Sequence, residues 1–167
     1  MPQPRYDSQY LADAAAIRDV HERYFQAVDR ADVAGVRACF AANVDATYHM
    51  RPLIRGLDAM MEAIILPFFG KLKAGTTKVS THFMGNFRIE RLEGDVAETE
   101  AYAIAIHVLA GDAADQLSVM SMRYLDRLRR TPDGWNIVTR VQTLDWKCEL
   151  PASFAMTLAQ RVMRLPA

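Results

Sequence analysis

The chain has 167 residues, with 20 lysines and arginines balanced by 20 aspartates and glutamates. This length fits one domain (residues 1–167) with a core and a pocket, and the zero net charge removes the long-range attraction that nucleic acid or an anionic membrane surface requires. Cys39 and Cys148 lack metal-ligand spacing, the N-terminus has no apolar signal region, and no apolar run reaches the roughly 18 residues of a membrane span. We therefore expect a soluble, cytoplasmic protein with free thiols that binds a small apolar molecule.

The N-terminal part of the chain predicts two consecutive helices. Residues 1–12 are predicted to be an arm, and apolar residues then recur at helical spacing over residues 13–30. Asp32 is a good N-cap for a short second helix over residues 33–40. This second helix is expected to pack back on the first.

A strand and a third helix follow. Residues 44–50 alternate between apolar and polar side chains, as in a half-buried strand. After a turn at Gly56, residues 58–69 predict a helix that Pro67 kinks or stops, because proline has no backbone N–H to donate.

Beyond residue 75 the apolar residues recur with period two, and turns rich in Gly and Asp separate the segments. The predicted strands cover residues 78–84, 87–92, 96–109, 116–129 and 135–146. Helices grouped before strands predict an α+β fold, with three helices on the concave face of a cone-shaped, curved, mostly antiparallel sheet. Residues 151–167 have helical spacing and predict a C-terminal helix or lid.

Asp29 and His82 are the most informative pair, because a carboxylate that orients an imidazole makes a general base near neutral pH. His107 ends a strand whose same-parity residues include a row of small side chains, Thr99, Ala101, Ala103 and Ala105. Such a row fits two interpretations equally: a sheet that lines a cavity, or a sheet against which a helix packs closely.

Four segments together resemble a known family. They are Ile17 to Asp29 (IRDVHERYFQAVD), Arg55 to Met60 (RGLDAM), Thr81 to Asn86 (THFMGN) and Asp133 to Trp135 (DGW). Their order and spacing are similar to those of the SnoaL-like branch of the nuclear transport factor 2-like superfamily. This resemblance covers nearly the whole chain and implies the same cone-shaped α+β fold, whose members range from enzymes to interaction domains.

The resemblance also implies a set of catalytic residues. Asp29 and His82 are placed like the Asp-His dyad of scytalone dehydratase, bile-acid dehydratase and hexachlorocyclohexane dehydrochlorinase. Tyr24 resembles the helix tyrosine of the bile-acid dehydratase. Tyr48 and His107 fall where scytalone dehydratase has a water-holding tyrosine and a second histidine.

Two further predictions concern the arginine and the walls of the site. Arg140 is the nearest match to an arginine that some of these enzymes use from the last strand, but its face of the sheet is ambiguous unless that strand has a bulge. The apolar pocket walls are expected to include Phe25, Phe69, Phe83 and Met84.

These residues suit a dehydratase or related elimination on a small apolar, cyclic carbonyl compound, with His82 as general base and no cofactor or metal. An isomerase or cyclase with the same dyad is the nearest alternative, and a docking domain like the small subunit of an aromatic-ring dioxygenase is a third. Metal binding by His49, His82 and His107 is disfavoured because these residues lie on separated strands without a short-range ligand pair.

A homo-oligomer is also expected. The family resemblance favours a trimer, with a dimer next. Residues 117–125 and 138–146 have apolar side chains on both faces of their predicted strands, and only one face can cover the pocket.

Overall fold

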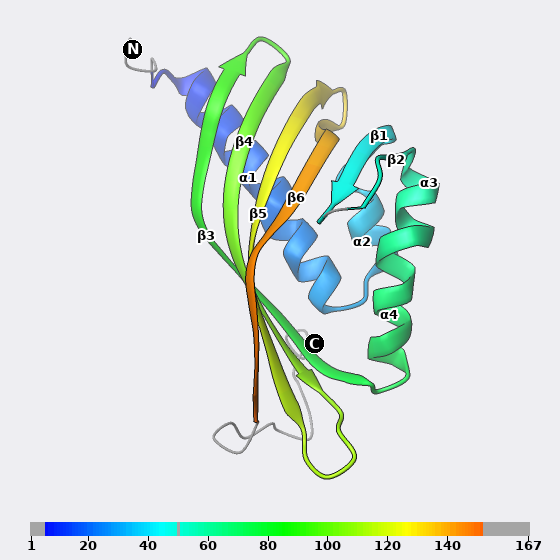
Figure 1. Cartoon of the computed structure of the whole chain (residues 1–167). Coiled ribbons are helices and arrows are strands. Elements are labelled where there is room, and N and C mark those ends of the chain that lie inside the picture. Colours follow the sequence, from blue (N-terminus) through cyan, green and yellow to red (C-terminus); the bar gives the residue numbers. More distant parts are fainter. Residues whose placement is uncertain (1–5, 50, 152–167) are drawn as a thin grey trace, which may run out of the picture.

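The computed structural model describes residues 6–49 and 51–151. One six-stranded sheet carries helices on one face and at one edge, and Figure 1 shows how strongly this sheet is twisted. The predicted α+β class is confirmed. The predicted C-terminal helix or lid lies outside the described residues, apart from Pro151 at the end of the last strand.

Helix α1 (Ser8–Asp29) begins five residues before the predicted start at residue 13, so the proposed arm of residues 1–12 is wrong for its last five residues. The cause is Asp7, whose carboxylate accepts a hydrogen bond from the Tyr10 backbone N–H at 2.8 Å and caps the helix there. Helix α2 (Val33–Arg37) has its predicted cap, because the Asp32 carboxylate accepts from the Gly35 N–H at 2.9 Å.

The third helical segment is divided into three parts. An α-helical turn, α3 (Leu57–Met60), continues into the π-helical turn η1 (Met61–Ile65) and then into α4 (Leu66–Lys73). Pro67 lies in the first turn of α4, so it begins a helix rather than ending one, and the predicted stop at this proline is wrong.

The strands are β1 (Phe40–Tyr48), β2 (Ile54–Arg55), β3 (Thr77–Glu93), β4 (Val96–Leu109), β5 (Gln116–Thr131) and β6 (Gly134–Pro151). Their order in the sheet is β2-β1-β6-β5-β4-β3, and every pair is antiparallel except β1 with β6. The two strands predicted over residues 78–92 are one strand, because the Gly85–Asn86 region forms an irregularity in the ladder rather than a turn.

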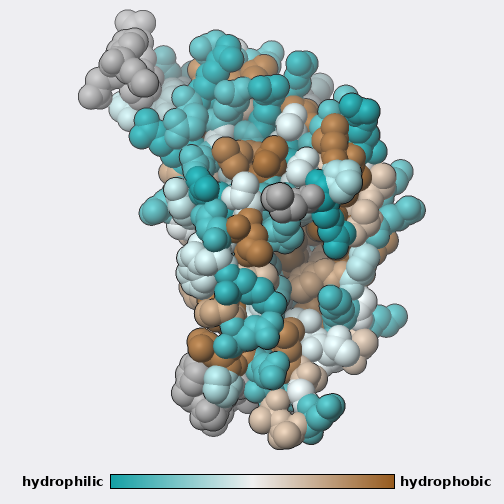
Figure 2. All heavy atoms as spheres, in the orientation of Figure 1, coloured by the Kyte–Doolittle hydropathy of each residue, from teal (hydrophilic) through white to brown (hydrophobic). Residues whose placement is uncertain are grey.

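Helix α1 lies along one face of the sheet (Figure 1), and His21 on this helix meets the Thr99 hydroxyl of β4 at 3.2 Å. Ala101, Ala103 and Ala105 are at most 1% exposed and belong to the hydrophobic core. The row of small side chains on β4 is therefore part of the hydrophobic core. On the face drawn in Figure 2, hydrophobic side chains form separate patches among hydrophilic ones.

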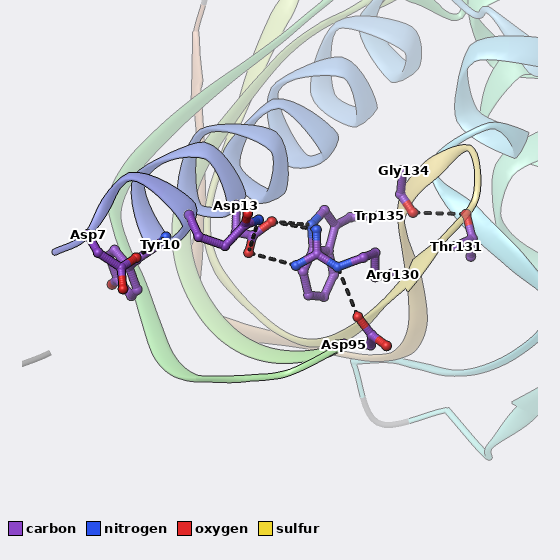
Figure 3. Close-up of polar contacts among 9 residues, drawn as sticks. Asp7, Tyr10, Asp13, Asp95, Arg130, Thr131, Gly134 and Trp135 are labelled. Atoms are coloured by element: carbon purple, nitrogen blue, oxygen red, sulfur yellow. Dashed lines mark hydrogen bonds and ion pairs between the residues drawn. The ribbon is translucent and has the colours of Figure 1, made fainter. Parts of the chain in front are cut away.

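A cluster of polar side chains links the first half of α1 to the turn between β5 and β6 through hydrogen bonds and ion pairs (Figure 3). Both Arg130 Nη atoms donate to the Asp13 carboxylate at 2.6 Å, and the Arg130 guanidinium stacks 4.6 Å from the centre of the Trp135 ring. These bonds from Arg130 lower the pKa of Asp13. Asp95 accepts the Nε–H of Arg130 at 3.0 Å, so a single arginine joins three elements.

Candidate functional site

A cavity of about 220 Å³ lies between the sheet and the helices. Its polar walls include three tyrosines, three histidines and one amide: Tyr24, Tyr48, Tyr124, His49, His82, His107 and Gln142. Its apolar walls include Val28, Ile64, Phe68, Met120 and Met122. This combination of apolar surface and a few convergent polar groups is typical of a small-molecule site.

The strand register explains why these groups converge. His82 on β3 pairs with Ala105 on β4, which pairs with Met120 on β5, so all three lie in one row across the sheet. Tyr124 and Gln142 form a similar pair between β5 and β6. Since cross-strand neighbours share a face, the register brings residues far apart in sequence to one side of the sheet.

The structure brings Asp29 and His82 into direct contact. The Asp29 Oδ1 atom lies 2.7 Å from the His82 Nδ1 atom, and the two side chains are 10% and 7% exposed. Asp29 is the last residue of α1, which packs on β3. With Nδ1 bound to a carboxylate, the Nδ1–H tautomer is favoured, and the lone pair of the other ring nitrogen, Nε2, is available to a molecule in the cavity.

Two further bonds fix the Asp29 carboxylate. The Ser80 hydroxyl donates to Oδ1 at 2.7 Å, and the backbone N–H of His82 donates to Oδ2 at 2.8 Å. Burial raises the pKa of Asp29, but the bonds from His82 and Ser80 outweigh it and leave the pKa below its ordinary value. The carboxylate is therefore ionised at neutral pH. The sequence interpretation missed Ser80, although its position two residues before His82 put it on the same face of the strand.

Tyr24 and Tyr48 meet inside the cavity, with their hydroxyl oxygens 3.4 Å apart. The Tyr48 hydroxyl also lies 3.7 Å from the Met60 sulfur. Burial and the nearby Tyr48 raise the pKa of Tyr24 well above its ordinary value, although Arg140 opposes this. Both residues line the cavity, and Tyr24 is a neutral hydroxyl that can donate a hydrogen bond.

His107 lies beside the dyad, with its ring centre 5.8 Å from that of His82 and 5.1 Å from that of Phe68. Burial and then the neighbouring His82 lower its pKa to about 4, so the imidazole is neutral at neutral pH. Its Nε2 atom is buried and has no hydrogen-bond partner among the described residues. It is therefore a buried polar atom whose hydrogen bonding is not satisfied by the described residues.

Arg140 does not line the cavity, which corrects the prediction that it acts there directly. It is 0% exposed, and its guanidinium donates to both oxygens of Asp126 at 2.9 and 2.6 Å. Burial lowers the pKa of Arg140, but Asp126 more than compensates and raises it well above the ordinary value. The guanidinium carbon lies 4.1 Å from the centre of the Tyr24 ring, so Arg140 makes a cation–π contact with this tyrosine inside the core. The sequence interpretation missed Asp126.

None of the four predicted apolar wall residues lines this cavity. Phe25 stacks on the His82 ring, with centres 5.7 Å apart, and Met84 packs against the core. Phe69 lines a different hollow, of about 570 Å³, which borders Asp29. Phe83 is 63% exposed, because the residue next to His82 on a strand must point to the opposite face.

Within residues 6–49 and 51–151, no helix is long and apolar enough to cross a membrane. The same ranges contain no group of three or more His, Cys, Asp or Glu side chains arranged to hold a metal ion. His49, His82 and His107 all line the cavity, but His82 is bound to Asp29 through Nδ1.

Comparison with known proteins places the chain in a family. Residues 9–141 match the SnoaL-like domain. Over 69 residues the chain is 39% identical to an uncharacterized protein of Mycobacterium tuberculosis, a match that covers 41% of this chain and 46% of that protein. The chain thus spans about half the length of the curated relatives it matches.

Two solved structures share the architecture. A protein from Novosphingobium aromaticivorans that was assigned as a scytalone dehydratase superposes with a TM-score of 0.72 at 18% identity, over 83% of this chain and 88% of that one. A hexachlorocyclohexane dehydrochlorinase from Novosphingobium barchaimii superposes with a TM-score of 0.69 at 14% identity, over 90% and 97% of the two chains. At these identities the likeness shows a common fold. The chain belongs to the SnoaL-like domain family and has the nuclear transport factor 2-like α+β fold.

Proposed function

We propose that this protein is a lyase that removes water, or a comparable leaving group, from a small apolar, cyclic carbonyl compound. The observation that carries the proposal is the contact of 2.7 Å between Asp29 and the Nδ1 atom of His82, at the wall of a cavity between the sheet and the helices. The names of the two structural neighbours, a dehydratase and a dehydrochlorinase, agree with this reaction class.

In the proposed reaction, His82 Nε2 takes the proton from the carbon next to the carbonyl. The electrons of the broken C–H bond form a carbon–carbon double bond as the leaving hydroxyl departs, and the imidazolium returns the proton to that hydroxyl to give water. The ionised Asp29 stabilises the imidazolium. A positioned base of this kind contributes about 100-fold to 10,000-fold in rate.

The tyrosine pair is assigned to the carbonyl. Tyr24 and Tyr48, 3.4 Å apart, would donate hydrogen bonds to the oxygen as it becomes enolate-like, directly or through water. His107, which is neutral because its pKa is about 4, would orient the leaving group by hydrogen bonding. It is not the proton donor in this scheme, because that proton comes from His82.

Turnover of cyclic β-hydroxy ketones in D₂O tests the proposal. A lyase produces the conjugated enone, seen as new ultraviolet absorbance, and His82→Gln abolishes it. Deuterium uptake at carbon without enone formation would instead indicate an isomerase or cyclase that uses the same dyad. If His82→Gln turns the substrate over at the wild-type rate, the assignment of the base is wrong.

We also propose that the chain forms a homo-oligomer, with a trimer favoured, through the outer face of the sheet. Phe83 and Trp146 are 63% and 50% exposed, and the ladder pairings Phe83–Ile104, Ile104–Ser121 and Ser121–Trp146 align them in one row. Light scattering that gives the 18.8 kDa mass of one chain at micromolar concentration would contradict this.

The described cysteines are free, which agrees with the predicted cytoplasmic location.

A further inference from the structure

Two basic residues line the cavity without any acidic counterpart. Arg51, between β1 and β2, and Lys71, on α4, both contribute to its wall. None of the described residues that line the cavity is an aspartate or glutamate. The Asp29 carboxylate lies beyond the His82 ring and is occupied by that ring, Ser80 and the backbone. The wall of the cavity is therefore positively charged.

Neither cation is paired with an acidic side chain. Most described lysines and arginines are in ion pairs, but Arg51 and Lys71 have no carboxylate partner among the described residues. Residues 1–5, 50 and 152–167 include no aspartate or glutamate in the sequence. No acidic side chain of those segments is present to pair with either residue.

The backbone of the π-helical segment holds Arg51 at this wall. Its Nη1 atom donates to the Ala63 carbonyl at 3.2 Å. In a regular helix that carbonyl would accept from the residue four positions later, but this residue is Pro67, which has no N–H. The irregular helix therefore provides an acceptor for the guanidinium, whose remaining N–H donors are left for another partner.

Lys71 lies one turn beyond Pro67 on the same helical segment. Its charge acts on His107: burial and then His82 lower the pKa of that residue, the Asp29 carboxylate opposes them, and Lys71 lowers the pKa further. Likewise burial, and then Arg51, lower the pKa of His49. The two cations thus act on two different histidines of one cavity.

We propose that the molecule bound in this cavity carries a carboxylate on its apolar body, and that Arg51 and Lys71 bind the carboxylate. The inference uses the proposed function only in naming that molecule the substrate. Val28, Phe68 and Met120 would cover its apolar part, and the negative charge would stay near solvent, where its desolvation costs least. A fully neutral substrate would leave both cations beside the cavity without an anionic partner.

A matched pair of probes tests the charge preference without catalysis. The fluorescent 2-naphthoate and its neutral isostere 2-naphthamide are titrated into the full chain, and dissociation constants are measured at low and high salt. We expect tighter binding of the carboxylate, with an advantage that shrinks at high salt. Arg51→Gln and Lys71→Gln should each weaken naphthoate binding about threefold to fivefold, the usual range for an exposed ion pair, and leave naphthamide unchanged.

Lys73→Gln is the matched control, because Lys73 is on the same helix, has no ion pair among the described residues and borders the other hollow. It should not change the preference. Equal binding of both probes by the wild type, or binding of neither, overturns the proposal. So does a preference that survives in the double variant of Arg51 and Lys71.

His82→Gln separates this inference from the proposed function. We expect the variant to keep the carboxylate preference even though it has lost turnover. If the preference disappears in His82→Gln, an imidazolium rather than Arg51 and Lys71 binds the anion, and the inference is wrong. Carboxylate-selective binding by a wild-type protein that eliminates nothing would instead contradict the proposed function and leave the anion site standing.

Discussion

Replacement of Asp29 by asparagine should disable His82 by changing which ring nitrogen carries the proton. The carboxylate accepts three bonds, from Ser80 Oγ, from the His82 ring and from the His82 backbone N–H. The backbone N–H can only donate, so the oxygen of the introduced amide must face it. The amide –NH₂ then faces His82 Nδ1, which has to become the acceptor.

This forced orientation sets the size of the effect. With Nδ1 as the acceptor, the proton moves to Nε2, and the lone pair available to the cavity is lost. The charge that stabilises the imidazolium is lost as well. We expect kcat/KM to fall about 100-fold to 10,000-fold, the worth of a positioned base. That loss corresponds to about 3–5 kcal/mol of transition-state stabilisation. The fold should persist, since the amide can still donate to the Ser80 hydroxyl.

Two measurements check this reasoning. Steady-state kinetics on a substrate of the wild type give the loss of activity, and nitrogen NMR of the imidazole reports the tautomer of His82 in both proteins. Asp19→Asn is the control, because Asp19 is an exposed carboxylate on the same helix and, among the described residues, pairs with exposed Arg23 alone. Activity of Asp29→Asn within threefold of the wild type, or a wild-type His82 protonated at Nε2 alone, would refute the argument.

Three further predictions concern stability. Arg140→Met leaves the buried Asp126 without its arginine partner and should lower the free energy of unfolding by about 3–5 kcal/mol. The additional substitution Asp126→Asn should restore part of this loss. Urea unfolding measures the loss, and a value below about 1 kcal/mol would count against the prediction. Asp13→Asn weakens the pair with the one-third exposed Arg130 and should cost about 1 kcal/mol, seen as a fall of a few degrees in Tm and contradicted by an unchanged Tm. Burial lowers the pKa of His21 from 6.5 to about 4, so between these two pH values the unfolded chain binds a proton at His21 that the folded chain does not bind. The free energy of unfolding should therefore fall as the pH drops from 6.5 to 4, and less steeply in His21→Gln; identical slopes would show that His21 does not contribute.

The sequence alone determined the fold class and the type of most helices and strands, but not all of their boundaries. Helical spacing over residues 13–30 and period-two segments after residue 75 gave the helix and strand types, because each repeat reflects which side chains must be buried. The positions of Asp29 and His82 within the SnoaL-like pattern were also predictable from the sequence. The Asp7 cap is a short signal of the same kind, since aspartate is a preferred N-cap residue.

The tertiary structure decided which side chains share a cavity. Phe68 rather than Phe69 reached its wall because a π-helical turn precedes both residues and alters the helical phase. Arg140 turned inward to Asp126 because strand pairing aligned these residues across β5 and β6. Sequence patterns report the face a residue takes within its own element. Partners are set by register and helix phase between elements. A shift of one residue moves a strand side chain to the opposite face of the sheet and rotates a helix side chain by about 100° around the helix axis.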